Sequence, residues 1–258
     1  MCGPQLIFLF VAWNSFNREF VIDIHSHILP EVDDGPKSWE TAEAMCRMAA
    51  QDGIEYMVAT PHANERYFYD RAYLSGLLGK LQQRIGVKPK LGLGCDFHLS
   101  FENMQSAMQT PEKYCIDQTR YLLVEFNNFN IPQPMDEWLA QMCEREITPI
   151  ITHPERNPIL QKSLERVQAW VATGCAVQIT ASVLTGSWGD RAAESAQWLL
   201  KKKAVHFLAT DAHDITRRPP NLSEARKVVA KNFGEEIADA LVEGNPGAVF
   251  RNQPIHKW

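Results

Sequence analysis

The sequence lacks the features that mark several large classes of protein. Its six cysteines include no C-x-x-C pair, which excludes a disulfide-rich scaffold and a four-thiolate zinc site and favours a reducing cytoplasm. Positive charge is not in excess, because 26 Lys and Arg face 31 Asp and Glu for a formal net charge of -5. Nucleic acid is therefore not an expected partner. The chain also contains no G-x-G-x-x-G or Walker loop for a nucleotide.

Long apolar segments are absent as well. The run from Leu6 to Trp13 (LIFLFVAW) is far shorter than the roughly 20 residues of a membrane span. No Lys or Arg precedes it, as a signal peptide would require. We therefore expect no stable membrane insertion and interpret residues 1–19 as an N-terminal extension outside the fold. With 45% hydrophobic residues, residues 20–258 suffice for one domain with one large core.

What the sequence does contain is an alternation of β-rich runs and segments with helical spacing of apolar residues. One helix is expected from a cap at Ser38 to Asp52-Gly53, and another from Ser163 to Gly174. Strands that alternate with helices pair in parallel, in an open sheet or a closed barrel, and without a nucleotide-binding loop we favour the barrel. The predicted strands are Phe20–His25, Glu55–Thr60, Lys90–Asp96, Tyr121–Glu125, Thr148–His153, Ala176–Thr180 and Val205–Thr210.

His, Asp and Glu residues gather where these predicted strands end. In a parallel barrel, all the carboxyl ends of the strands surround one mouth. His25 and His27 are one residue apart, as are Asp211 and His213, and in a strand this spacing places both side chains on one face. A single His or Asp at a strand end is more often a cap or a buried polar group. Most of the eight histidines in the chain gather at one rim, which favours a metal centre.

Nine residues are candidate metal ligands, whereas a tetrahedral zinc ion takes four. They are His25, His27, Asp34, His62, Asp96, Glu125, His153, Asp211 and His213. The number predicts two or three divalent cations, and mixed imidazole and carboxylate ligation suits manganese, iron or zinc. Such clusters activate water near neutral pH and hold the oxygens of a displacement at phosphorus. The predicted chemistry is therefore hydrolysis.

A series of short motifs runs in order between about Val21 and Gln253. They are D-I-H-S-H at 23–27, D-D-G-P at 33–36, A-T-P-H at 59–62, T-H-P-E-R at 152–156, T-D-A-H at 210–213 and R-P-P at 218–220. The chain thereby resembles the polymerase and histidinol phosphatase (PHP) family and, within it, the metal-dependent tyrosine phosphatases of bacterial capsule and exopolysaccharide loci. This resemblance implies a distorted seven-stranded (β/α)7 barrel of the TIM-like, PHP type. It also implies a three-ion site, usually loaded with manganese, with iron or zinc as alternatives.

The resemblance assigns the candidate ligands to three ions. It implies that His25, His27, Asp96 and Asp211 bind one, that Asp96, Glu125 and His153 bind a second, and that Asp34, His62 and His213 bind a third. Asp96 stands where many relatives carry Glu, one methylene longer. Such a difference shifts the strand or the ions, or introduces a water.

Further residues are candidates for contact with substrate. Arg156 and Arg218 match the phosphate-binding arginines of the family, and a guanidinium offers paired N–H groups to phosphoryl oxygens. The alternative for both arginines is a surface salt bridge. His98, two residues after Asp96, and Tyr67, just beyond His62, are weaker candidates, with a loop histidine and ordinary aromatic packing as alternatives.

The resemblance implies that the protein hydrolyses phosphotyrosine on the tail of a bacterial tyrosine kinase that acts as a polysaccharide co-polymerase. This hydrolysis would regulate capsule or exopolysaccharide synthesis. A tyrosine leaving group has a pKa near 10, so it needs less help from a general acid than a serine alcohol. The alternatives are a small-molecule phosphomonoesterase of the histidinol phosphate type and a non-catalytic module that binds a phosphorylated tail. A homo-oligomer is compatible with the sequence.

Overall fold

The computed structural model describes residues 20–256, except for the side chains of Phe101 and Glu102. The extension predicted for residues 1–19 lies outside the described residues. Within the described range, none of the helices has the length and apolar character that crossing a membrane requires.

The strands form two parallel sheets. Their orders are β1-β2-β4 and β3-β5-β6-β7-β8-β9, and every pairing in both sheets is parallel. An isolated parallel bridge between Ser26 and Ala212 joins the end of β1 to the residues after β9. The predicted α/β class with parallel strands is confirmed. The strands are β1 (Ile22–Ser26), β2 (Tyr56–Ala59), β3 (His62–Ala63), β4 (Lys90–Leu93), β5 (Asp96–His98), β6 (Tyr121–Glu125), β7 (Thr148–Thr152), β8 (Ala176–Thr180) and β9 (Phe207–Ala209).

The predicted strand count of seven is wrong for the described residues, because one predicted run is divided in two and a short extra strand forms after another. The run Lys90–Asp96 is divided into β4 and β5, and β3 follows β2 after a break at Thr60 and Pro61. Proline has no N–H to donate to a sheet, which explains why pairing stops there. The backbone still connects the two sheets, since the Asp96 N–H lies 3.2 Å from the Pro61 carbonyl oxygen.

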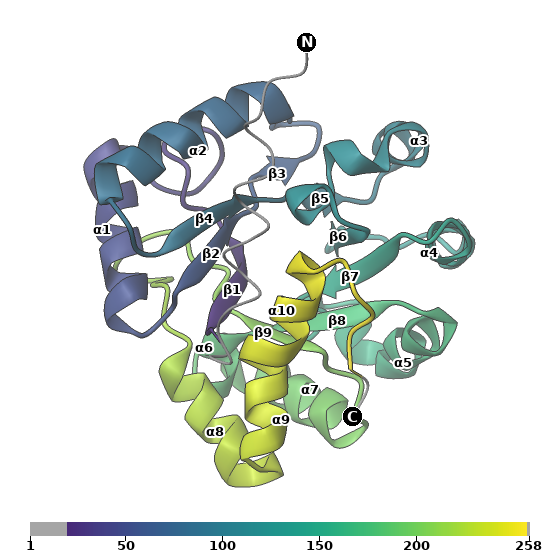
Figure 1. Ribbon diagram of the computed structural model, residues 1–258. Helices are drawn as coiled ribbons and strands as arrows, with labels where there is room; N and C mark the ends of the chain where they lie inside the picture. Colours follow the sequence, from purple (N-terminus) through teal and green to yellow (C-terminus); the bar gives the residue numbers. More distant parts are fainter. Residues whose placement is uncertain (1–19, 257–258) are drawn as a thin grey trace.

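The helices surround the strands (Figure 1). The Ser38 hydroxyl accepts the Thr41 N–H at 3.2 Å and caps α1, as predicted. Gly174 ends α5 with a φ of 118°, but Ser163 makes no side-chain cap bond at the start of that helix. The helices are α1 (Trp39–Gln51), α2 (Arg71–Ile85), α3 (Phe101–Gln109), α4 (Pro134–Glu144), α5 (Leu164–Thr173), α6 (Ala181–Leu184), α7 (Gly189–Lys201), α8 (Ser223–Phe233), α9 (Glu235–Asp239) and α10 (Asn245–Phe250).

Two apolar cores flank the strands. The larger lies between strands and helices, and the smaller lies between strands of both sheets and includes Ile24, Leu123 and Phe207. Val249 of α10 belongs to the smaller core, and the Arg120 N–H, just before β6, donates to Asn252 Oδ1 at 2.9 Å. The C-terminal segment therefore packs at the amino ends of the strands, and the opposite end remains for the site.

Candidate metal centre

The nine candidate ligands lie at or shortly after the carboxyl ends of β1, β2, β4, β6, β7 and β9. His25 belongs to the end of β1, Glu125 is the last residue of β6, and His62 and Asp96 begin the short strands β3 and β5. The others follow β1, β7 and β9. The fold thus brings together residues that are up to 188 positions apart, from His25 to His213.

These ligands form four overlapping groups, in each of which the ligand atoms lie within 4.8 Å of one another. The groups are His27, Asp34, His62 and His213; His25, His27 and Asp96; His25, His153 and Asp211; and His62, Asp96 and Glu125. Because the groups share members, they make one continuous cluster. The family pattern assigns one ion to Asp96, Glu125 and His153, but these three do not form a group of their own. His153 Nε2 nevertheless lies 3.7 Å from Glu125 Oε1.

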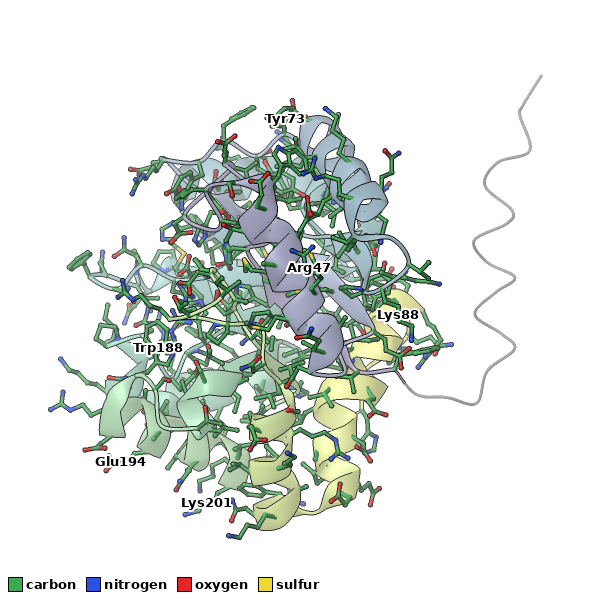
Figure 2. The ribbon with its side chains drawn as sticks, turned by 90° about the vertical axis from the view of Figure 1, so that its left-hand side faces the viewer. Arg47, Tyr73, Lys88, Trp188, Glu194 and Lys201 are labelled. Carbon is green, nitrogen blue, oxygen red and sulfur yellow. The ribbon has the colours of Figure 1, made fainter. Side chains whose placement is uncertain are left out.

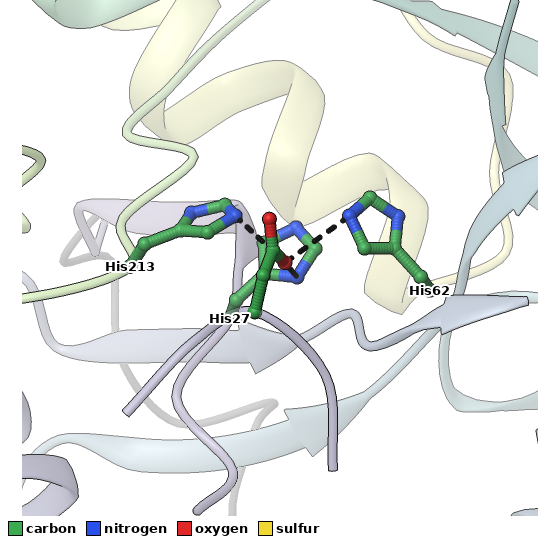
Figure 3. Close-up of side chains that lie close together, drawn as sticks. His27, His62 and His213 are labelled. Atoms are coloured by element: carbon green, nitrogen blue, oxygen red, sulfur yellow. Dashed lines mark ion pairs between the residues drawn. The ribbon is translucent and has the colours of Figure 1, made fainter. Parts of the chain in front are cut away.

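Three imidazoles converge on the carboxylate of Asp34 (Figure 3). His62 Nε2 and His213 Nε2 each lie 3.3 Å from Asp34 Oδ1, and His27 Nδ1 lies 3.9 Å from it. The histidines are largely buried, whereas the Asp34 side chain is 48% exposed. Asp34 therefore closes this part of the cluster on the solvent side.

The two β1 histidines are oriented by partners that the sequence analysis did not identify. His27 Nδ1 donates to Asp33 Oδ2 at 2.7 Å, and His25 Nδ1 donates to Gln178 Oε1 at 2.9 Å. Both acceptors hold a proton on Nδ1, so the Nε2 atoms face the cluster, where they are 3.4 Å apart. Partners of this kind are typical behind metal-bound histidines.

The donor atoms fit a cation. Within the described residues, His62 Nδ1 and both carboxylate oxygens of Asp96 are buried and make no hydrogen bond, although His62 Nδ1 is 3.3 Å from Asp96 Oδ2. Buried polar atoms without a partner are costly. Imidazole nitrogens and carboxylate oxygens are also the atoms that manganese, iron and zinc take as ligands. A cation at this position would give these atoms the partner that they lack.

Protons compete for the same atoms. Burial lowers the pKa of His25, but Asp211 and Asp96 outweigh it and raise the pKa to about 9. Burial and the neighbouring His213 lower the pKa of His27 to about 4. Burial and the Asp96 carboxylate raise the pKa of Glu125 to about 8. At neutral pH the metal-free cluster therefore holds protons that a cation must displace.

Backbone geometry brings several ligands into place. A Cβ at Gly35 would lie 2.5 Å from the His27 carbonyl oxygen, so only glycine lets the loop after β1 fold over His27 and present Asp34. His153 and Asp211 have φ values of 33° and 51°, in the left-handed region that non-glycine residues rarely occupy. Such outliers are common at functional sites.

Arg156 and Arg218 lie at the edge of the cluster. Arg156 Nη1 and Arg218 Nη2 both donate to Asp211 Oδ2, and Arg156 Nη1 also lies 3.2 Å from Thr180 Oγ1. Both side chains contact the ring of Trp188. Two guanidinium groups thus meet beside a candidate ligand, where they add positive charge to the site.

The two weaker substrate candidates lie beside ligands. The Tyr67 ring stacks on His62 with centroids 5.9 Å apart and an interplanar angle of 13°. His98 ends β5 and pairs in register with Glu125. Burial lowers the pKa of His98, so this imidazole is held towards its neutral form.

Comparison with known proteins gives a consistent result. Residues 21–251 match the family model for capsular polysaccharide synthesis, CpsB/CapC. The chain is 33% identical to CapC of Staphylococcus aureus, over 92% of this chain and 94% of that protein. It is 30% identical to the tyrosine-protein phosphatase YwqE of Bacillus subtilis (strain 168), with the same coverage.

Solved structures agree. One comes from the work on YwqE of Bacillus subtilis and CpsB of Streptococcus pneumoniae, which are described as unique metal-dependent tyrosine phosphatases. It superposes on this chain with a TM-score of 0.86 at 29% sequence identity, and the match covers 92% of this chain and 97% of that one. A phosphotriesterase homology protein from Escherichia coli, at 10% identity, has a TM-score of 0.60 over 90% of this chain and 98% of that one. The second similarity concerns the fold alone.

Proposed function

The chain belongs to the CpsB/CapC family of capsular polysaccharide synthesis, and on that premise we propose that it is a metal-dependent phosphatase that hydrolyses phosphotyrosine on a bacterial tyrosine kinase. The observation that carries the proposal is the cluster of ligand atoms at the carboxyl ends of the strands, found in a relative of tyrosine-protein phosphatases. Control of capsule or exopolysaccharide synthesis is the corresponding role.

We propose two or three divalent ions, with manganese first and iron or zinc as alternatives, held by the nine candidate ligands. The negative charge of the candidate ligands supports two or three ions. Four of the ligands are carboxylates, Asp34, Asp96, Glu125 and Asp211, and two divalent ions balance four negative charges. The guanidinium groups of Arg156 and Arg218 beside Asp211 add positive charge, so a site with two or three ions is suited to a phosphate dianion.

Bound ions supply Lewis-acid chemistry, because they withdraw charge from phosphoryl oxygens and lower the pKa of a coordinated water. The protein residues bind and orient the substrate. Arg156 and Arg218, which meet at Asp211, would offer guanidinium donors to the phosphoryl oxygens, which gain negative charge as the bond to the tyrosine oxygen breaks. Asp33 and Gln178 keep His27 and His25 in the tautomer that leaves Nε2 free.

We also propose that the two sheets are parts of one distorted barrel and that residues 20–258 form a single domain. The bridge between Ser26 and Ala212 joins the end of β1 to the residues that follow β9. In such a barrel, the small core to which strands of both sheets contribute would lie inside the ring. If β2 with β3, and β4 with β5, each count as one interrupted strand, the ring has the seven strands that the sequence predicts.

The test is an assay of the purified chain with a phosphotyrosyl peptide, a phosphoseryl peptide of the same sequence and a small amino-alcohol phosphate. We expect hydrolysis of the phosphotyrosyl peptide first, its loss with a chelator and its return with Mn²⁺. Elemental analysis is expected to give at least two ions per active chain. Preference for the small phosphate would favour the histidinol phosphate type of enzyme. Binding of the peptide without turnover would favour a phosphotail-binding module.

A further inference from the structure

We propose that Trp188, in the loop before α7, is a positioning residue that holds Arg156 and Arg218 for phosphoryl binding. The inference rests on the proposed function and extends it, because no family motif found in the sequence includes this tryptophan. This residue is 44% exposed and lies at the surface of the molecule (Figure 2).

One aromatic ring contacts both arginines. The guanidinium carbon of Arg156 lies 3.7 Å from the centroid of the Trp188 ring, and that of Arg218 lies 5.3 Å from it. A cation over an aromatic face is attracted by the negative face of the ring, most strongly for tryptophan. The ring therefore offsets part of the repulsion between two positive groups that both reach Asp211 Oδ2.

The contact leaves one donor of Arg156, its Nε–H, available for a ligand, whereas Nη1 donates to Asp211 Oδ2 and lies 3.2 Å from Thr180 Oγ1. A guanidinium that stacks through its face keeps its N–H groups in the plane, pointing outward. The Arg156 Nε is buried and makes no hydrogen bond to the described residues. A phosphoryl group that approaches the edge of the guanidinium finds this donor already oriented.

The loop conformation holds the tryptophan in this position. Trp188 has a φ of 73°, in the left-handed region that bulky side chains rarely adopt, and it lies between Gly186 and Gly189, whose φ values are 99° and 78°. The indole N–H donates to the Ser182 hydroxyl at 3.0 Å. A half-exposed aromatic ring in this conformation, anchored at its polar end, indicates a function beyond the filling of a core.

The experiment compares Trp188→Phe and Trp188→Leu with Trp198→Phe in the full-length, metal-loaded protein. Trp198 is a matched control, because it lies on α7 and has Lys202 over its ring at 5.6 Å, away from the candidate ligands. We expect Trp188→Leu to lower kcat/KM for the phosphotyrosyl peptide about tenfold and to weaken inhibition by inorganic phosphate to a similar degree. Trp188→Phe, which keeps an aromatic face, is expected to stay within about threefold of wild type, as is the Trp198 variant, with metal content unchanged in all.

Several results would overturn the assignment. Wild-type rates and phosphate inhibition in Trp188→Leu would remove any role for the ring. Equal losses in the Phe and Leu variants would assign the effect to the indole N–H or to ring size. A loss with the aryl substrate but normal inhibition by inorganic phosphate would mean that the ring contacts the substrate itself.

A spectroscopic measurement covers the case in which Trp188→Leu fails to fold. Titration with inorganic phosphate is expected to change the tryptophan fluorescence of wild type and of Trp198→Phe, because an anion bound to the two arginines changes the electrostatic environment of the indole that they contact. The change should be absent in Trp188→Phe, and its persistence there would contradict the proposal. Since inorganic phosphate needs no turnover, this result stands even if the wild-type protein does not hydrolyse phosphotyrosine, which would refute the proposed function alone.

Discussion

The substitution Gly35→Ala tests whether the loop after β1 positions Asp34. The added Cβ would lie 2.5 Å from the His27 carbonyl oxygen and 3.1 Å from Asp33 Oδ1, whereas ordinary contacts begin at 3.4 Å. The closer atom belongs to the backbone, so it has no rotamer to change. The loop must therefore move by about 0.9 Å, which is the gap between 2.5 Å and an ordinary contact.

This movement has a calculable effect. Overpacking of a tight position costs about 1–3 kcal/mol of stability, and a displacement near 1 Å in a catalytic arrangement lowers rates by about 100-fold. We therefore expect Gly35→Ala to reduce kcat/KM for the phosphotyrosyl peptide by roughly this factor. Measurement of rate, bound metal and melting temperature on the same sample checks the expectation.

The control is the same chemical change at Gly79, on the exposed face of α2, where an added Cβ meets nothing within 4 Å. Alanine in a helix interior is about 0.5–1 kcal/mol more favourable than glycine. Gly79→Ala is thus expected to raise the melting temperature and leave the rate unchanged. Full activity and stability in Gly35→Ala would show that the loop is not held against His27.

Four further predictions concern separate features of the chain. Replacement of Arg156 or Arg218 by Lys keeps the charge but loses the paired N–H groups. We therefore expect kcat/KM to fall more than about tenfold, which corresponds to about 1.4 kcal/mol of transition-state stabilisation, with bound metal unchanged. Wild-type rates in both variants would assign phosphate binding to other residues. Asp33→Asn should weaken metal affinity about 10–100-fold in a metal titration, and equal affinity would exclude a role behind His27. Burial raises the pKa of Glu155 to about 7 from 4.5. Between these pH values the folded chain binds more protons than the unfolded chain, so the free energy of unfolding falls as the pH rises through them. In urea titrations at several pH values, Glu155→Gln should make this decline less steep, and an unchanged dependence on pH would contradict the prediction. Deletion of residues 1–19 should preserve rate and melting temperature, because every motif begins at or after Asp23; loss of either would place the apolar run within the fold.

The strands were predictable where side chains alone determine them. Tyr121–Glu125 and Ala176–Thr180 are strands with the predicted bounds, because both are short, mostly apolar segments in which nearly every residue is buried on either face. Two-residue β3 has no periodicity to detect. It forms because its neighbour β5 offers backbone partners at Asp96 and Phe97, a tertiary contact that local sequence does not encode.

The candidate ligands were predictable as a set, because parallel strands bring their carboxyl ends together whatever lies between them. Their partners were not. Gln178 reaches His25 from a strand 153 residues further along the chain, and glutamine within a β-rich run carries no signal of such a contact. Asp33 was visible within the D-D-G-P motif, but only the structure shows that it contacts His27 while Asp34 faces the cluster.

The same geometry that prepares the site for cations makes it costly without them. His153 and Asp211 adopt left-handed backbone conformations, which cost about 1–2 kcal/mol per residue, and the Asp96 oxygens are buried without a hydrogen bond from the described residues. Packing in the two cores must offset these costs, because the cluster does not favour its own assembly. The core side chains therefore support a preformed arrangement of ligands, and a cation that enters it releases protons and gives the buried carboxylate its partner.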